Sequence, residues 1–70
     1  MGDNLVGKTV KLTLVGLDGN AFALMGAFKK AAREQGWTAP EIDIVIQACM
    51  AGDYDNLLTV LMEHTEEPNN

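Results

Sequence analysis

The first residues whose types and spacing could carry chemistry are GDNLVGKT, residues 2–9, which match the phosphate-loop pattern of Gly, four residues, then Gly-Lys-Thr. Such a loop binds phosphate because a strand leads into the glycine-rich turn and the following helix aims its free N–H groups at the anion. Here a strand pattern follows where that helix should begin, and the chain has little room for the parallel sheet that holds such loops. We therefore expect no bound nucleotide.

Nucleophilic, acid–base and metal chemistry have few candidates. The chain has no Ser, and its one cysteine, Cys49, falls on the inward face of a predicted helix, where a buried thiol is the ordinary outcome. The one histidine, His64, falls in the last turn of another predicted helix, where a partly charged imidazole favours the helix dipole. One Cys and one His cannot build a structural zinc site, and Asp53 and Asp55 lack the further ligands of a calcium loop. The sequence predicts no enzyme activity, no cofactor and no metal.

The elements that would position these residues begin with a strand at residues 8–15, KTVKLTLV. Its side chains alternate between polar and apolar, the period of a half-buried strand, and the apolar ones are Val10, Leu12 and Leu14. We expect residues 1–7 to be a disordered leader and 66–70 a frayed polar tail. A single domain then covers residues 8–65.

Three helices are predicted after the strand, at about 21–35, about 39–51 and from residue 54 to His64. Each start and stop has a local signal. Gly36 is suited to a left-handed helix end, Trp37 can pack at the corner, and the helix caps are Asn20, the capping box Thr38–Glu41, and Asp53. The fold class is α+β, with one N-terminal strand followed by three helices.

A lone strand leaves backbone N–H and C=O groups without partners. The simplest remedy is the same strand from a second copy, paired antiparallel about a two-fold axis. The predicted helix at 39–51 also has a second apolar strip, which suits a shared surface. We therefore expect a homodimer whose interface contains Val10, Leu12, Leu14 and Ile44.

Charge is distributed unevenly along the chain. The net charge is −5, yet all five basic residues precede residue 34. Phe22, Lys29 and Arg33 share one stripe of the first helix, and an aromatic ring beside two cations suits docking of an acidic partner. The alternative places Phe22 under the strand or the other subunit. No basic segment leads into an apolar run at the N-terminus, and no apolar run is long enough for a bilayer. These patterns predict a cytoplasmic, non-enzymatic dimeric module that binds another protein and no membrane.

Three blocks, LVGLDGNAF (14–22), QGW (35–37) and GDYDNLL (52–58), carry a resemblance over residues 14–64. The chain resembles a family of small uncharacterised proteins from bacteria and their mobile elements. The resemblance implies a compact domain with these turns, and it implies no activity.

The strand, the first helix, the Gly36-Trp37-Thr38 corner and the second helix also resemble the layout of ribbon-helix-helix DNA-binding proteins. This resemblance implies that Thr9, Lys11 and Thr13 read bases in the major groove from a dimeric ribbon. Two departures stand against it: a longer loop at residues 16–20, and Glu41 and Asp43 where a phosphate would lie. A DNA-binding regulator is the alternative function.

Overall fold

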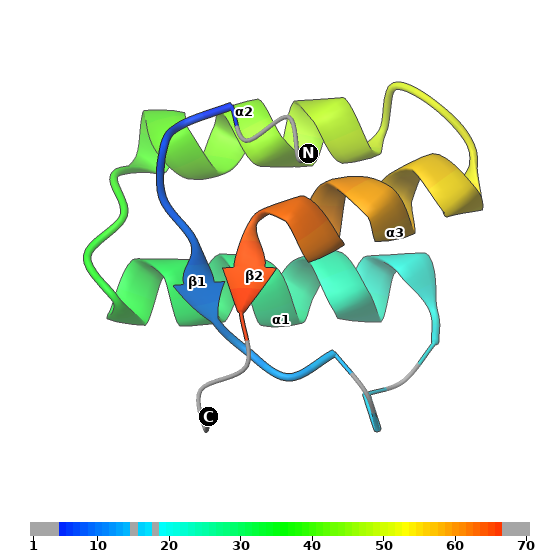
Figure 1. The fold of residues 1–70 in the computed structure, drawn as a ribbon, viewed down its shortest axis with the longest axis horizontal. Helices are drawn as coiled ribbons and strands as arrows, with labels where there is room; N and C mark the ends of the chain where they lie inside the picture. The colour runs from blue at the N-terminus through cyan, green and yellow to red at the C-terminus, as the bar shows by residue number, and fades with distance from the viewer. Residues whose placement is uncertain (1–4, 15, 18, 67–70) are drawn as a thin grey trace.

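The computed structural model describes residues 5–14, 16–17 and 19–66. The helices and strands are β1 Val10–Lys11, α1 Ala21–Glu34, α2 Ala39–Cys49, α3 Tyr54–Glu63 and β2 Thr65–Glu66. In Figure 1, α1 and α2 run in opposite directions, α3 packs against both, and the two strands lie side by side in front of α1. The predicted α+β class, one strand followed by three helices, is confirmed. The sequence did not indicate the second strand.

Each helix begins at the cap that the sequence predicts. The Asn20 side chain accepts hydrogen bonds from N–H groups in the first turn of α1, and Asp53 does the same for α3. At the start of α2, the Glu41 N–H donates to Thr38 Oγ1 at 3.4 Å, and the Thr38 N–H donates to Glu41 Oε1 at 2.9 Å. These bonds satisfy donors that have no partner inside a helix, so the three starting points are set locally.

The corner between α1 and α2 depends on a glycine and a tryptophan. Gly36 has φ of 92°, a left-handed conformation that favours glycine, and it reverses the chain. The Trp37 N–H then donates to the Ala32 carbonyl at 3.0 Å. The indole ring packs edge-to-face on Phe28, with ring centroids 5.5 Å apart. The corner is therefore a rigid junction that fixes where α2 starts relative to α1.

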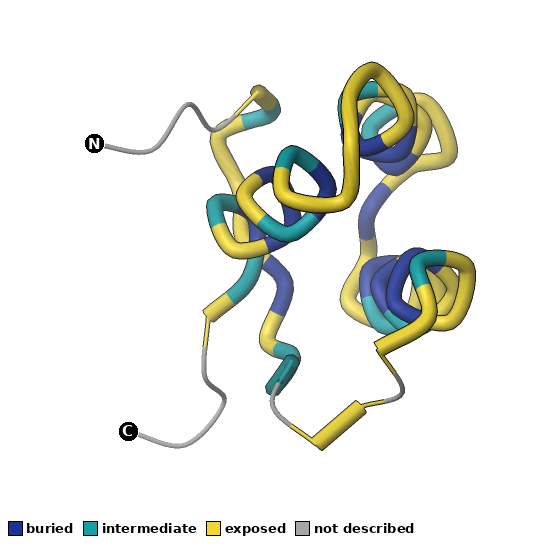
Figure 2. The backbone as a smooth tube through the Cα atoms, turned by 90° about the vertical axis from the view of Figure 1, so that its right-hand side faces the viewer, coloured by how far each residue is buried: buried dark blue, intermediate teal, exposed yellow. Residues whose placement is uncertain are grey.

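The core lies where the three helices and β1 meet, and the tube in Figure 2 shows buried residues turned toward this centre. Its members are Val10, Leu24, Met25, Phe28, Ala32, Trp37, Ile42, Val45, Ile46, Cys49, Leu57, Val60 and Leu61. The spacing of Tyr54, Leu57, Leu58, Leu61 and Met62 in the sequence predicts one buried stripe on α3, but Tyr54 and Met62 are 45% and 65% exposed. This prediction is wrong for these two residues because the face of α3 that meets α1 and α2 is centred on Leu57 and Leu61.

Both edges of β1 are occupied within the chain. On one edge β1 pairs parallel with β2, and the Val10 N–H donates to the His64 carbonyl at 2.8 Å. On the other edge the Gln35 side chain accepts from the Lys11 N–H at 2.8 Å and donates to the Lys11 carbonyl at 2.9 Å. The expectation that the strand lacks a partner in its own chain was therefore wrong. A homodimer stays a prediction, and pairing at Lys11 would require Gln35 to leave this edge.

His64 joins the N-terminal segment to the end of α3. It is fully buried, its Nε2 accepts from the Leu5 N–H at 2.9 Å, and its Nδ1 lies 2.7 Å from the Val60 carbonyl. Since a backbone N–H can only donate, Nε2 is the acceptor and Nδ1 carries the proton. The ring thus links two backbone groups, a role that the sequence did not indicate.

The ends of the predicted domain extend further than the sequence indicated. Residues 5–7 were expected to be part of a disordered leader, but Leu5 is bonded to His64 and Val6 packs against the core. Glu66 was expected in the tail, and it belongs to β2. Residues 1–4 of the predicted leader and 67–70 of the predicted tail lie outside the described residues.

Candidate functional site

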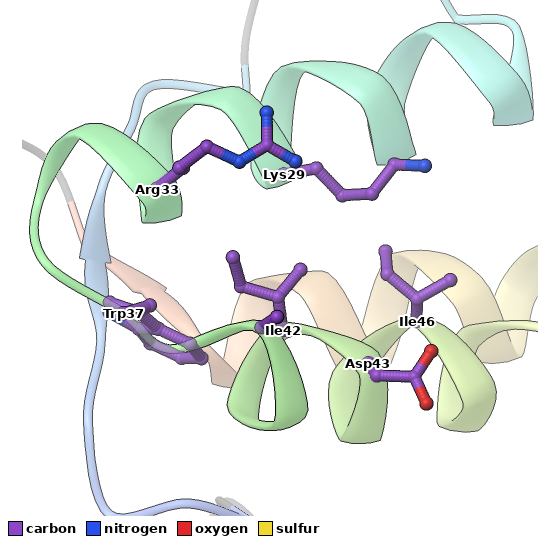
Figure 3. A pocket seen from close by; sticks show the side chains of 7 residues that line it. Lys29, Arg33, Trp37, Ile42, Asp43 and Ile46 are labelled. Atoms are coloured by element: carbon purple, nitrogen blue, oxygen red, sulfur yellow. The ribbon is translucent and has the colours of Figure 1, made fainter.

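A groove of about 360 Å³ lies between the C-terminal half of α1 and the N-terminal half of α2. The residues that line this α1–α2 groove are Lys29, Arg33, Trp37, Ala39, Ile42, Asp43 and Ile46. In Figure 3, Ile42 and Ile46 point from α2 toward α1, while Lys29 and Arg33 extend from α1 over the opening. The groove thus has an apolar floor and a cationic rim.

Lys29 and Arg33 give this groove a local positive charge in a chain whose net charge is −5. Both residues are exposed, and within the part of the chain that the structure describes neither side chain forms an ion pair or a hydrogen bond. Asp43 lies on the α2 side of the opening. An anionic group is therefore attracted to the α1 rim and repelled from the α2 rim. A carboxylate that accepts two bonds from the Arg33 guanidinium fits this geometry.

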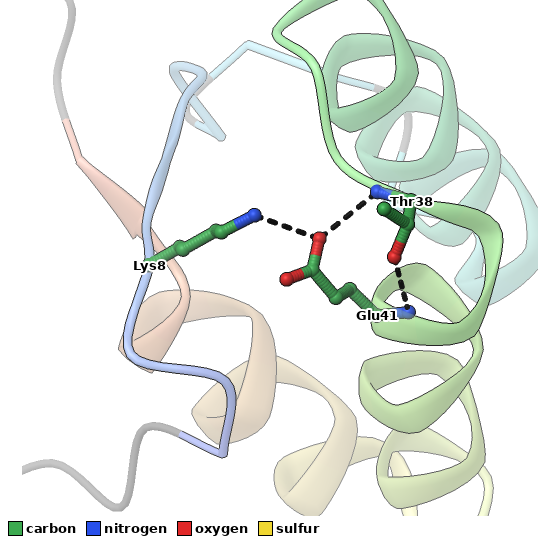
Figure 4. A network of polar contacts seen from close by, with 3 residues as sticks. All are labelled: Lys8, Thr38 and Glu41. Atoms are coloured by element: carbon green, nitrogen blue, oxygen red, sulfur yellow. Dashed lines mark hydrogen bonds and ion pairs between the residues drawn. The ribbon is translucent and has the colours of Figure 1, made fainter.

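A network of polar contacts centred on Glu41 lies at the first turn of α2, next to the groove (Figure 4). Lys8 Nζ lies 2.7 Å from Glu41 Oε1, the same oxygen that accepts from the Thr38 N–H. The hydrogen bond from Lys8, followed by that from Thr38, lowers the pKa of the Glu41 carboxyl below its ordinary value of 4.5. Lys8 Nζ also lies 5.9 Å from the centroid of the Trp37 ring. The segment before β1 thus supports the wall of the groove.

A second hollow, of about 280 Å³, lies at the opposite ends of α1 and α2, next to the start of α3. Its lining residues are Ala21, Phe22, Met25, Cys49, Met50, Gly52, Asp53, Tyr54 and Leu57, and we call it the apolar hollow. The large side chains at its rim, Phe22, Met50 and Tyr54, are 78%, 58% and 45% exposed. The Tyr54 hydroxyl donates to the Gly19 carbonyl, which holds the ring at this rim.

The structure separates the members of the partner patch that the sequence proposed. Lys29 and Arg33 line the α1–α2 groove together, whereas Phe22 lies at the rim of the apolar hollow. Phe22 does not tuck under the strand, because 78% of it is exposed. The three residues share a stripe of α1 but face two different depressions.

The residues proposed for a dimer interface lie in different environments. Val10 is fully buried in the core of its own chain, while Leu12 and Leu14 are half-buried and pack against that core. Ile44 is 46% exposed on the outer side of α2. Of these four residues, Ile44 is therefore the most accessible to a second copy.

The residues proposed to read DNA bases are also used within the fold. The Thr9 hydroxyl donates to Glu66 Oε2 at 2.9 Å, Lys11 is exposed, and Thr13 is half-buried. Thr9 is also the Thr of the phosphate-loop pattern, whose Lys8 is bonded to Glu41. The element that follows Thr9 is β1 rather than the helix whose N-terminus a phosphate loop requires.

The two residues with the most reactive side chains are enclosed. Cys49 is 1% exposed, and burial raises the pKa of its thiol to about 11. Both ring nitrogens of His64 are engaged by backbone groups. Among the described residues, no group of three His, Cys, Asp or Glu side chains could hold a metal ion.

Several lining residues were not singled out from the sequence as functional. Ile42 and Ile46 share a helix face with Val45 and belong to the core, and Trp37 was expected as a corner residue. Periodicity shows that such a face is apolar, but it does not show that a groove borders it between α1 and α2. Met50 is a large apolar residue that lies beside the predicted inward face of the helix at 39–51, and this position is a sequence signal for an exposed apolar surface.

Comparisons of the chain with protein-family models, curated proteins and solved structures find no match. The resemblance carried by the blocks at 14–22, 35–37 and 52–58 therefore stays a prediction. None of the helices in the described residues has the length and apolar character needed to cross a bilayer.

Proposed function

We propose that this chain is a non-enzymatic, cytoplasmic protein-interaction module that binds an acidic, partly apolar segment of another protein in the α1–α2 groove. The observation that carries the proposal is the pair of exposed cations, Lys29 and Arg33, above an apolar floor. Protein interfaces combine an apolar anchor in a pocket with charged groups at the rim. A carboxylate that lies close to an apolar side chain complements this arrangement.

Two further observations support a binding role without catalysis. The buried Cys49 thiol has a raised pKa, which disfavours the thiolate that a nucleophile requires. The His64 imidazole has both nitrogens bonded to backbone groups, so neither is available to a substrate. Nucleic acid fits the groove less well than an acidic peptide, since a net charge of −5 and the nearby Asp43 repel phosphates.

A peptide selection on the immobilised full chain tests the proposal. Random peptides of about 16 residues, long enough to cross the groove as a helix, are displayed on phage and enriched on the wild-type chain. We expect the enriched peptides to combine Asp or Glu with Leu, Ile or Phe. They should bind Lys29→Glu and Arg33→Glu at least about 10-fold more weakly than wild type, a loss of about 1.4 kcal/mol.

Lys30→Glu is the matched control, because Lys30 is exposed on α1 but does not line the groove. It changes the net charge as much as Lys29→Glu does, and we expect it to weaken binding by less than about 3-fold, the size of a long-range charge effect. Enrichment of basic peptides, or equal binding to wild type and Arg33→Glu, would overturn the proposed function. The homodimer is a separate proposal, which sedimentation equilibrium of the wild-type chain tests.

A further inference from the structure

Gly26 is a residue that nothing in the described chain explains. It lies in the middle of α1 and is exposed, and apart from its chain neighbours and the adjacent backbone of α1, none of the described atoms lies within 4 Å of the position that a Cβ would take. Its φ is not in the left-handed region, so the backbone does not demand glycine. A glycine in a helix interior costs about 1 kcal/mol relative to alanine. Gly26 therefore leaves a low point on the helix surface that the fold itself does not use.

This low point lies between the two depressions already described. On α1, one stripe at spacings of four, three and four residues contains Phe22, Gly26, Lys29 and Arg33. On α2, the side toward α1 contains Ile42, Ile46 and Met50 at intervals of four residues. The helices α1 and α2 run in opposite directions (Figure 1). Arg33 and Ile42 accordingly line the α1–α2 groove, and Phe22 and Met50 line the apolar hollow near the other ends of the same two helices. We call the line between α1 and α2 that runs from one depression to the other the seam.

We infer that a single amphipathic helix of the partner lies along this seam, with its acidic residues over Lys29 and Arg33 and its apolar residues over Gly26 and the apolar hollow. The inference rests on the proposed function and adds the partner's secondary structure and the extent of its contact. With a rise of about 1.5 Å per residue, the stripe from Phe22 to Arg33 is about 16 Å long, which corresponds to three turns of a bound helix. Two depressions along the line between two helices, with a glycine between them that permits close approach, suit the helix-in-groove mode of recognition.

Charge selects an acidic partner over a second copy of this chain. If α1 of a second copy lay parallel along the seam, Lys29 and Arg33 of both copies would face one another, and like charges at an interface are costly. If it lay antiparallel, the cations of each copy would meet the apolar hollow of the other, whose lining residues include one carboxylate, that of Asp53. An acidic helix instead neutralises both cations. The apolar end has no basic residue among those that line it, so the match of charge is confined to the other end and fixes which way the partner helix runs.

The experiment uses the full-length chain and the peptides enriched in the selection described above. Gly26→Leu places a bulky side chain at the middle of the seam. Ala23→Leu is its matched control, because Ala23 is exposed on α1 but lies off the stripe. Leucine is a better helix former than glycine, so Gly26→Leu should fold at least as stably as wild type, as measured by thermal unfolding. Peptide affinity is then measured by titration calorimetry for each variant.

We expect Gly26→Leu to weaken peptide binding by at least about 10-fold, and Ala23→Leu by less than about 2-fold. Phe22→Ala should weaken binding by about 5-fold or more, since it removes an apolar anchor. Equal effects of Gly26→Leu and Ala23→Leu, with binding still lost in Arg33→Glu, would overturn the inference and leave the proposed function intact. Peptides that bind Arg33→Glu as tightly as wild type would overturn both the inference and the proposed function. Self-association of the wild-type chain that Gly26→Leu abolishes would identify a second copy as the occupant and overturn the assignment of an acidic partner helix.

Discussion

Replacing His64 by leucine tests the two hydrogen bonds by which its buried imidazole joins the N-terminal segment to α3. The imidazole is fully buried and joins the Leu5 N–H to the Val60 carbonyl, two groups that are far apart in the sequence. Leucine has a similar volume but no polar atom, so it fills the space and leaves both groups without this partner. The Val60 carbonyl lies beneath a buried side chain, whereas Leu5 is 51% exposed and its N–H can be rehydrated.

The expected loss follows from these two groups. A buried polar group without a partner costs about 1–3 kcal/mol, and a hydrogen bond that water can replace costs about 0.5–1.5 kcal/mol. His64→Leu should therefore lower the free energy of unfolding by about 1.5–4.5 kcal/mol. For a domain of this size the total is roughly 4–10 kcal/mol, so the change is a large share of it.

Urea unfolding followed by the fluorescence of Trp37, the only tryptophan, measures this loss. With a denaturant slope of about 1 kcal/mol/M, the midpoint should fall by about 1.5–4.5 M. His64→Asn keeps a donor near the Nδ1 position and His64→Gln keeps an acceptor near the Nε2 position, so each should lose less than His64→Leu. Met62→Leu at an exposed site is the control and should change stability by less than about 0.5 kcal/mol. A loss below about 0.5 kcal/mol in His64→Leu would refute the reasoning.

Three further predictions concern the thiol, the capping box and the strand edge. Because the pKa of Cys49 is raised from 9.0 to about 11, alkylation of the native chain in mildly alkaline buffer should be at least about 100-fold slower than in urea, and equal rates would contradict this. Because the pKa of Glu41 is lowered in the folded state, its contribution to stability should be present above pH 4.5 and lost as the pH falls through the lower folded value. Urea midpoints of wild type and Glu41→Gln should accordingly converge in acid, and a gap that does not depend on pH would contradict the ion pair with Lys8. Gln35→Ala should cost about 1 kcal/mol and speed hydrogen exchange of the Lys11 amide, whereas Glu34→Ala beside it should do neither.

The helix boundaries could be predicted because their causes are local. Asn20, Thr38 with Glu41, and Asp53 each satisfy N–H groups within three residues of themselves, and Gly36 acts at its own φ. Such signals are visible in any sequence window that contains them. The α+β class and the order of strand and helices followed from these signals together with the alternation in residues 8–15.

The partner strand of β1 and the hydrogen bond from Leu5 to His64 could not be predicted. Each depends on residues far apart in the sequence, and the partner strand is very short. β2 has only two residues, too few to show a period of two, and the bond from Leu5 to His64 joins residues 59 positions apart. Gln35 occupies the outer edge of β1 with a side-chain amide, and its residue type alone gives no sign of this. The inference of an unpaired strand failed for these reasons.

Of the candidate site, the residues on α1 could be predicted from the sequence, whereas the residues of the groove floor on α2 could not. The stripe of Phe22, Lys29 and Arg33 follows from helical periodicity, which places residues on a common face. The floor formed by Ile42 and Ile46 does not, because periodicity cannot tell a covered apolar face from one that borders a groove. Glycine is an unfavourable residue inside a helix, so the type of Gly26 is itself a signal, but only the structure shows that the space above it is left open by the chain.

Chemical-shift mapping of an enriched acidic peptide on the isotope-labelled chain tests most directly whether the α1–α2 seam is a binding surface. We predict that the largest amide shifts follow the seam from Arg33 and Lys29 past Gly26 to Phe22 and Met50, and that they vanish with Arg33→Glu. Shifts confined to β1 or to the outer face of α3, or shifts that persist in Arg33→Glu, would contradict a binding role for this seam.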